Sequence, residues 1–141
     1  MKYGATVLSL LALAVGSALP AAAACSGSDP GITVAKVAST STSGGLTTYK
    51  LSVTVTNQGT QGQAGNVLQS VQMFQDSVKV DEKGIPPLKA GASYTFTHNY
   101  VRASDAGNGT TVYRFQLFMH QPTGTGPANC SASNDRYILT F

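Results

Sequence analysis

The chain has few side chains for acid–base or metal chemistry: two histidines, two cysteines and six carboxylates among 141 residues. His98 and His120 lie in segments that we expect to form strands of different sheets, so they do not predict a shared zinc site. The carboxylates lie in segments typical of loops and strand ends: Asp29, Asp76, Asp81, Glu82, Asp105 and Asp135. Neither a Gly-x-Ser-x-Gly nucleophile motif nor a phosphate-binding glycine loop occurs. The sequence therefore predicts no catalytic residue, no metal site and no cofactor.

The segments that carry these residues alternate between apolar and polar side chains, which is typical of half-buried antiparallel strands. Strands are predicted over residues 32–37, 46–57, 67–75, 78–80, 94–101, 111–120 and 136–141. Turn-forming residues separate them, including a Ser/Thr/Gly loop over 39–45, a flexible glycine loop over 59–65, and Asp81–Gly84, which we expect to end the fourth strand. This pattern predicts an all-β fold, an immunoglobulin-like Greek-key β-sandwich of about seven antiparallel strands.

The parity of each strand also assigns the core. The residues predicted to face inward are Tyr49, Leu51, Val53, Val55, Tyr94, Phe96, Tyr113, Phe115, Leu117, Met119, Tyr137, Leu139 and Phe141. Phe118 breaks the pattern, because it lies on the polar parity of its strand. Either a loop covers this ring, or the ring is exposed and available to a ligand. His120 is on the same outward parity, and the two residues are the candidate binding residues.

The first 24 residues have the features of a signal peptide. Lys2 provides a positive start, residues 7–15 are apolar, and a run of small residues permits cleavage after Ala24. We therefore expect a periplasmic or secreted protein in which residues 25–141 form a single domain without a transmembrane segment. Only 11% of the residues are charged, the net charge is +3, and the basic residues do not cluster. This distribution argues against a nucleic-acid partner.

Three landmarks in the strands and turns resemble a known family. Val53–Thr60 ends a strand in Asn-Gln-Gly, Leu88–Thr97 contains a Leu-x-x-Gly linker before a strand, and Asn129–Thr140 is an Asn-containing turn before the last strand. These features are similar to those of CARDB domains, the cell-adhesion-related immunoglobulin-like modules of bacteria, from about Asp29 to Phe141. The resemblance implies a surface or periplasmic attachment module without general enzymatic activity. The acidic residues that often precede the family's final Asn pair are missing here, so the resemblance does not extend to a cation contact at this turn.

The two cysteines allow two interpretations. Cys25 precedes the first predicted strand and Cys130 precedes the last, and these strands are commonly neighbours in an immunoglobulin-like sandwich. A disulfide between them would then be within reach and would suit an oxidising compartment. Alternatively, Cys25 is the acylated cysteine of a surface lipoprotein. The residue three places before it is the small Ala22, and acylation would remove the only other cysteine with which Cys130 can pair.

These features together predict a non-catalytic exported module for binding or adhesion, with a protein or polysaccharide partner at the cell envelope. The loops over 58–66, 104–110 and 121–129, or an exposed strand edge, are the predicted recognition elements. The alternative is a small secreted enzyme or inhibitor, which two carboxyl groups converging in a cleft would favour.

Overall fold

The computed structural model describes residues 26–105, 109–120 and 129–141, and within them the chain forms strands and no helix. The predicted all-β fold is therefore confirmed. The strands are β1 (Pro30–Ser43), β2 (Leu46–Asn57), β3 (Leu68–Gln75), β4 (Val78–Ile85), β5 (Ser93–Ala103), β6 (Val112–His120) and β7 (Arg136–Thr140). The signal peptide predicted for residues 1–24 lies outside the described residues.

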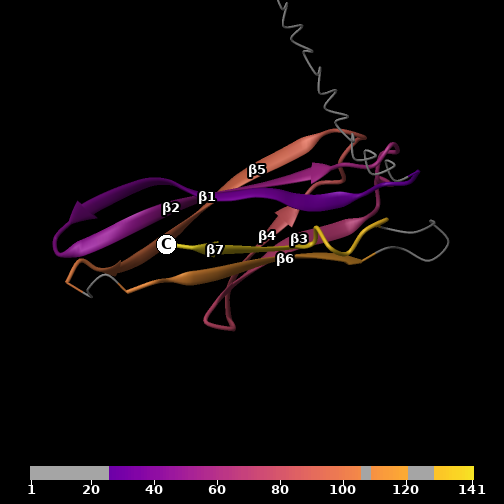
Figure 1. Cartoon of the computed structure of the whole chain (residues 1–141). Helices are drawn as coiled ribbons and strands as arrows, with labels where there is room; N and C mark the ends of the chain where they lie inside the picture. The colour runs from indigo at the N-terminus through magenta and orange to yellow at the C-terminus, as the bar shows by residue number, and fades with distance from the viewer. Residues whose placement is uncertain (1–25, 106–108, 121–128) are drawn as a thin grey trace, which may run out of the picture.

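The strands form two antiparallel sheets that face each other (Figure 1). The three-stranded sheet has the order β1-β2-β5, and the four-stranded sheet has the order β4-β3-β6-β7. The chain crosses between the sheets after β2, β4 and β5, which gives the Greek-key connectivity of an immunoglobulin-like sandwich. A backbone hydrogen bond from Ile32 N to Asn134 O, 2.8 Å long, joins β1 to the turn before β7.

The core lies between the sheets and follows the predicted parity. Leu51, Val53 and Val55 of β2 are fully buried, and they face the buried Tyr113 and Phe115 of β6. The other residues predicted to face inward are buried or pack partly buried against this cluster: Tyr49, Tyr94, Phe96, Leu117, Met119, Tyr137, Leu139 and Phe141. Burial of one large apolar side chain is worth about 1.5 to 3 kcal/mol, so these positions dominate the stability of the sandwich.

Two predicted strand boundaries are wrong by more than two residues. The segment 39–45 was expected to be a loop, but β1 continues to Ser43 and returns through Gly44 and Gly45, which have φ values of 56° and 76°. Such consecutive positive φ values suit a two-residue hairpin turn. The extension is polar and exposed, yet it pairs with β2, and the Thr42 and Thr47 hydroxyls bond at 3.0 Å. Threonine is enriched in strands, and pairs of threonines on adjacent strands can bond through their hydroxyls.

The second error concerns β4, which continues through Asp81–Gly84 to Ile85 instead of ending at residue 80. This segment pairs with β3, with Gly84 opposite Ser70 and Glu82 opposite Gln72. The two acids were assigned to loops or strand ends but lie inside a strand, where their side chains have partners. Their polar sequence does not end the strand because β4 is an edge strand and its residues 78–84 are exposed.

The loop after β2 is hydrogen-bonded to the segment before β5, although its glycines predicted a flexible segment. The backbone of Gln63 donates to Leu88 O at 2.9 Å, and the Gln63 side chain accepts from Leu88 N at 2.9 Å. Gly59 is required for a close approach and not for a positive φ. A Cβ added there would lie 2.0 Å from the backbone oxygen of Gly27. The loop therefore belongs to the rigid framework of this end of the sandwich.

Candidate functional site

The outward side of the four-stranded sheet is the most distinctive surface of the described residues. We call it the four-strand face and define it by the outward side chains of β3, β6 and β7 together with two residues of β4. These side chains are Leu68, Ser70, Gln72, Phe74, Lys79, Glu82, Val112, Arg114, Gln116, Phe118, His120, Arg136 and Ile138. The pairing register places Ser70 opposite Phe118 and Arg114 opposite both Phe74 and Ile138. Inward packing of the alternate residues directs these side chains to solvent.

Large apolar side chains are exposed on this face. The exposed fractions are 69% for Leu68, 57% for Phe118, 51% for Ile138 and 40% for Val112. Of the two interpretations of Phe118, the structure therefore shows the exposed one. Several apolar residues exposed on a single sheet face are characteristic of an interaction surface more than of a bare solvent-facing sheet.

One end of the four-strand face has a shallow hollow of about 250 Å³. Leu68, Ser70, Phe118 and His120 line it, and Leu68 and His120 are directly paired across β3 and β6. Phe118 and His120, the two residues predicted from the sequence to bind, are neighbours on the outward side of β6, and the fold adds Leu68 and Ser70 of β3 beside them. Neither Phe118 nor His120 is buried, so both can contact a ligand.

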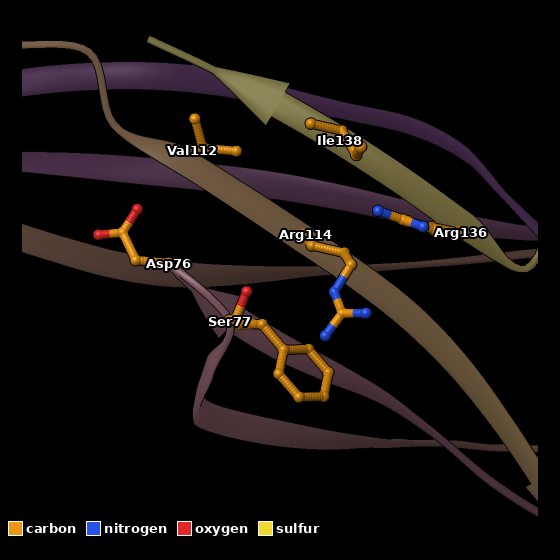
Figure 2. A pocket seen from close by; sticks show the side chains of 7 residues that line it. Asp76, Ser77, Val112, Arg114, Arg136 and Ile138 are labelled. Carbon is orange, nitrogen blue, oxygen red and sulfur yellow. The ribbon is translucent and has the colours of Figure 1, made fainter.

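The other end of the face has a larger hollow, of about 360 Å³. Its lining residues are Phe74, Asp76, Ser77, Val112, Arg114, Arg136 and Ile138 (Figure 2). The Arg114 guanidinium carbon lies over the Phe74 ring, 4.1 Å from its centroid, which is a cation–π contact. Sequence reasoning missed this site. The only signal for it was a basic residue on the outward parity of each of two late strands.

The arginines of the larger hollow are not neutralised within the described residues. Neither Arg114 nor Arg136 forms an ion pair there, and Figure 2 shows the carboxylate of Asp76 directed away from the Arg114 guanidinium. By contrast, Lys79 of β4 is paired with Glu82. The hydrogen bonds that Lys79 and then Ser70 donate lower the pKa of the Glu82 carboxyl. The four-strand face thus combines a neutralised pair on the edge strand β4 with an arginine pair on β6 and the opposite edge strand β7.

The opposite surface, on the three-stranded sheet, also exposes apolar side chains, namely Val34, Leu46 and Val101, but its polar groups are mostly paired. Serine and threonine hydroxyls there bond one another across the strands, as in the 2.8 Å contact between Thr54 Oγ1 and Thr95 Oγ1. Among the described residues, three further bridges of the same kind link the strands of this sheet, and another joins Thr47 to Ser104 just after β5. Hydroxyls that already have partners offer less to a ligand, so the four-strand face is the better candidate for recognition.

His98 links the two sheets through its side chain. Its Nδ1 lies 2.9 Å from Asp81 Oδ2 of β4, and its Nε2 lies 3.5 Å from the Tyr113 hydroxyl of β6. Burial, followed by the nearby Tyr100 and Asp81, raises the pKa of Tyr113 to about 12, so its phenol stays protonated at neutral pH. His98 and His120 belong to different sheets, as predicted. Among the described residues there is no group of three or more His, Cys, Asp and Glu side chains suited to a metal ion.

The predicted disulfide and loops are only partly within the described residues. Cys25 lies outside them, whereas the backbone N of Cys130 donates to Ser28 O at 3.1 Å. The loops over 104–110 and 121–129 include residues 106–108 and 121–128, which also lie outside. No helix in the described part of the chain is long and apolar enough to span a membrane.

Comparison with protein families gives one match: a family model described as CARDB matches residues 29–116. This range contains β1 to β5 and the first part of β6, and it includes two of the three sequence landmarks. The third landmark and β7 lie beyond it, although β7 pairs with β6 in the same sheet. Comparisons with curated proteins and with solved structures found no significant match.

Proposed function

The chain belongs to the CARDB family of non-enzymatic immunoglobulin-like domains, and from this premise we propose that it is an exported, non-catalytic module for binding or adhesion. Its partner is a protein or a polysaccharide of the bacterial cell envelope. The mature protein consists of residues 25–141, after removal of residues 1–24, and acts in the periplasm or outside the cell. No metal or cofactor takes part in this function.

The observation that carries the proposal is the four-strand face. Leu68 and Phe118 are large, exposed and adjacent on β3 and β6, and an arginine pair lies on the same face. Binding sites concentrate their energy in a few apolar anchors and arginines, surrounded by polar contacts. The rigid sandwich beneath fixes these side chains, so little conformational entropy is lost when a partner binds.

Export suits the proposed pairing of Cys25 with Cys130. The hydrogen bond between Cys130 N and Ser28 O places Cys130 beside a residue three positions after Cys25. A disulfide at this point would close a loop of more than 100 residues, which corresponds to about 4 to 5 kcal/mol of stabilisation in the chain-entropy model. A lipoprotein acylated at Cys25 is the competing arrangement.

Binding of labelled mature protein to purified envelopes of the source bacterium tests the proposal. We expect Phe118→Ser to weaken binding by about tenfold, because it removes an exposed aromatic anchor. Val101→Ser is the matched control, since Val101 is 48% exposed on the three-stranded sheet. Protease treatment and periodate oxidation of the envelopes then distinguish a protein from a polysaccharide partner. Equal losses for the two variants, or no loss with Phe118→Ser, would exclude the four-strand face as the binding surface.

A further inference from the structure

We propose that the larger hollow of the four-strand face, between Arg114 and Arg136, binds the carboxylate groups of an acidic polysaccharide. This inference rests on the proposed function of that face and names the chemical class of its ligand. The chemical group that the hollow recognises is a planar carboxylate attached to a sugar ring, as in a polyuronate.

The geometry of the two arginines suits a carboxylate. Arg136 and Arg114 lie on adjacent strands, where Arg114 pairs with Ile138 and Gln116 pairs with Arg136. The two arginines are therefore diagonal neighbours on one face, with Cα atoms about 7 to 8 Å apart, within reach of a common ligand. The guanidinium group presents parallel N–H donors that match the two oxygens of a carboxylate.

Arg114 is held ready for this role by its neighbours. Its guanidinium stacks on Phe74, and stacking leaves the N–H donors at the rim of the plane available. Val112 and Ile138, exposed by 40% and 51%, form an apolar wall of the same hollow. Figure 2 shows both side chains on the same side of the sheet as the arginines. An apolar wall beside two cations suits a sugar ring, which combines C–H groups with a charged substituent.

The sheet itself favours a polysaccharide over an extended peptide. β3 pairs with β4 and β6, and β6 pairs with β3 and β7, so the backbone groups of both central strands are already bonded within the sheet. A peptide recognised by strand addition would pair with the outer edge of β4 or β7 and run beside the face, whereas Arg114 lies on the central strand β6. Sugar hydroxyls and carboxylates are instead recognised by side chains.

The length of the face fits an extended chain. From Arg114 to His120 along β6 is about 20 Å, at about 3.4 Å per residue. One oligosaccharide can therefore contact both hollows, with its carboxylate at the arginine pair and a further sugar at Phe118 and His120.

Isothermal titration calorimetry of the mature protein with oligogalacturonate tests the inference. The matched ligand is the methyl-esterified oligomer, which has the same sugar backbone without charge, and poly-glutamate represents an acidic peptide. We expect oligogalacturonate to bind and the ester to bind at least about tenfold more weakly, since charged hydrogen bonds contribute strongly to affinity. Poly-glutamate should also bind at least about tenfold more weakly, because it has carboxylates but no sugar ring to pack against Val112 and Ile138. Equal binding of the ester, or tighter binding of poly-glutamate, would overturn the inference.

Variants of the protein locate the site. Arg114→Gln and Arg136→Gln should each weaken oligogalacturonate binding by about tenfold, and Arg114→Lys should also weaken it, because lysine keeps the charge but loses the planar donors. Lys50→Gln removes the same charge from the three-stranded sheet and should change affinity by less than about twofold. Circular dichroism checks that each variant is folded, and Arg136→Gln changes a side chain that is exposed on the edge strand β7. An equal loss with Lys50→Gln would contradict a specific site.

The oligogalacturonate and envelope-binding experiments together distinguish a failure of the carboxylate inference from a failure of the proposed function. If oligogalacturonate does not bind but envelope binding still depends on Phe118, the carboxylate inference is wrong and the four-strand face remains the binding surface. If the Phe118 variant binds envelopes like the parent protein, the four-strand face is not the binding surface, and if the parent protein does not bind envelopes at all, the proposed function itself fails.

Discussion

Replacement of Asn57 by alanine should destabilise the protein more than any exposed polar substitution. Asn57 is the last residue of β2 and is fully buried. Its Oδ1 accepts hydrogen bonds from the backbone N of Asp29 at 2.8 Å and of Gly59 at 3.1 Å. Its Nδ2 donates to the carbonyl oxygens of Gln61 at 2.8 Å and of Leu88 at 3.1 Å. One amide thus joins the N-terminal segment, the loop after β2 and the segment before β5.

The magnitude follows from the groups that lose their partners. Asn57→Ala leaves two buried N–H groups without an acceptor, each at about 1 to 3 kcal/mol, or about 2 to 6 kcal/mol together. Water that enters the vacated space can bond some of these groups, so we expect a loss of about 2 to 4 kcal/mol in the free energy of unfolding. A domain of this size has about 5 to 15 kcal/mol in total, so the variant should unfold at a much lower urea concentration.

Urea unfolding followed by tyrosine fluorescence suits a chain with six tyrosines and no tryptophan. Asn66→Ala is the control, because Asn66 is exposed in the same loop and the change there should shift the free energy by less than about 0.5 kcal/mol. Asn57→Asp tests the reasoning further. It keeps the acceptor but places a second carboxylate oxygen against the two carbonyls, so it should also destabilise. Equal stability of Asn57→Ala and Asn66→Ala would refute the argument.

Three further predictions concern the core, the terminal turn and the cysteines. Val53→Lys should prevent folding because Val53 is fully buried, whereas Thr54→Lys on the outward parity should shift the melting temperature little; equal shifts would contradict the assigned faces. Burial raises the pKa of Asp135 above its ordinary value of 3.8, and a hydrogen bond from a neighbouring asparagine opposes this shift. The protonated Asp135 carboxyl therefore contributes fully to the stability of the folded state below that pH. This contribution is lost as the pH rises through the folded-state pKa. Asp135→Asn should therefore gain stability relative to the parent protein between acidic and neutral pH, as measured by urea unfolding, and a constant difference would exclude this explanation. Mass spectrometry of the exported protein without reductant should give a mass lower than that of the reduced form by two hydrogen atoms, whereas a diacylglycerol adduct on Cys25 beside a Cys130 thiol would show the lipoprotein arrangement instead.

Buried strands were the most predictable part of the molecule. The bounds expected for the second strand, Leu46–Asn57, are those of β2, and every residue assigned to its inward parity contacts the core. The reason is local, because a strand with one buried face must repeat its apolar residues with a period of two. The family landmarks are equally local. Gly59 marks a close approach of two backbones, and Asn57 bonds the segments around it.

The pairing of exposed strand segments was harder to predict from the sequence than the burial of core residues. The residues that extend β1 to Ser43 and β4 to Ile85 are polar, so they have no apolar alternation that could reveal them. Their strand conformation depends on hydrogen bonds to a neighbouring strand, which is information about the partner and not about the segment itself.

The four-strand face also combines features that the sequence determines with features that only the fold determines. The sequence by itself determined that Phe118 and His120 point away from the core, because parity is a property of one strand. Only the tertiary structure decided that Leu68 lies beside them, and that Arg114, Arg136 and Phe74 line one hollow. These residues come from different strands, and the register between strands determines which side chains meet. That register depends on packing of the whole sheet against its opposite layer, which no single segment of the sequence records.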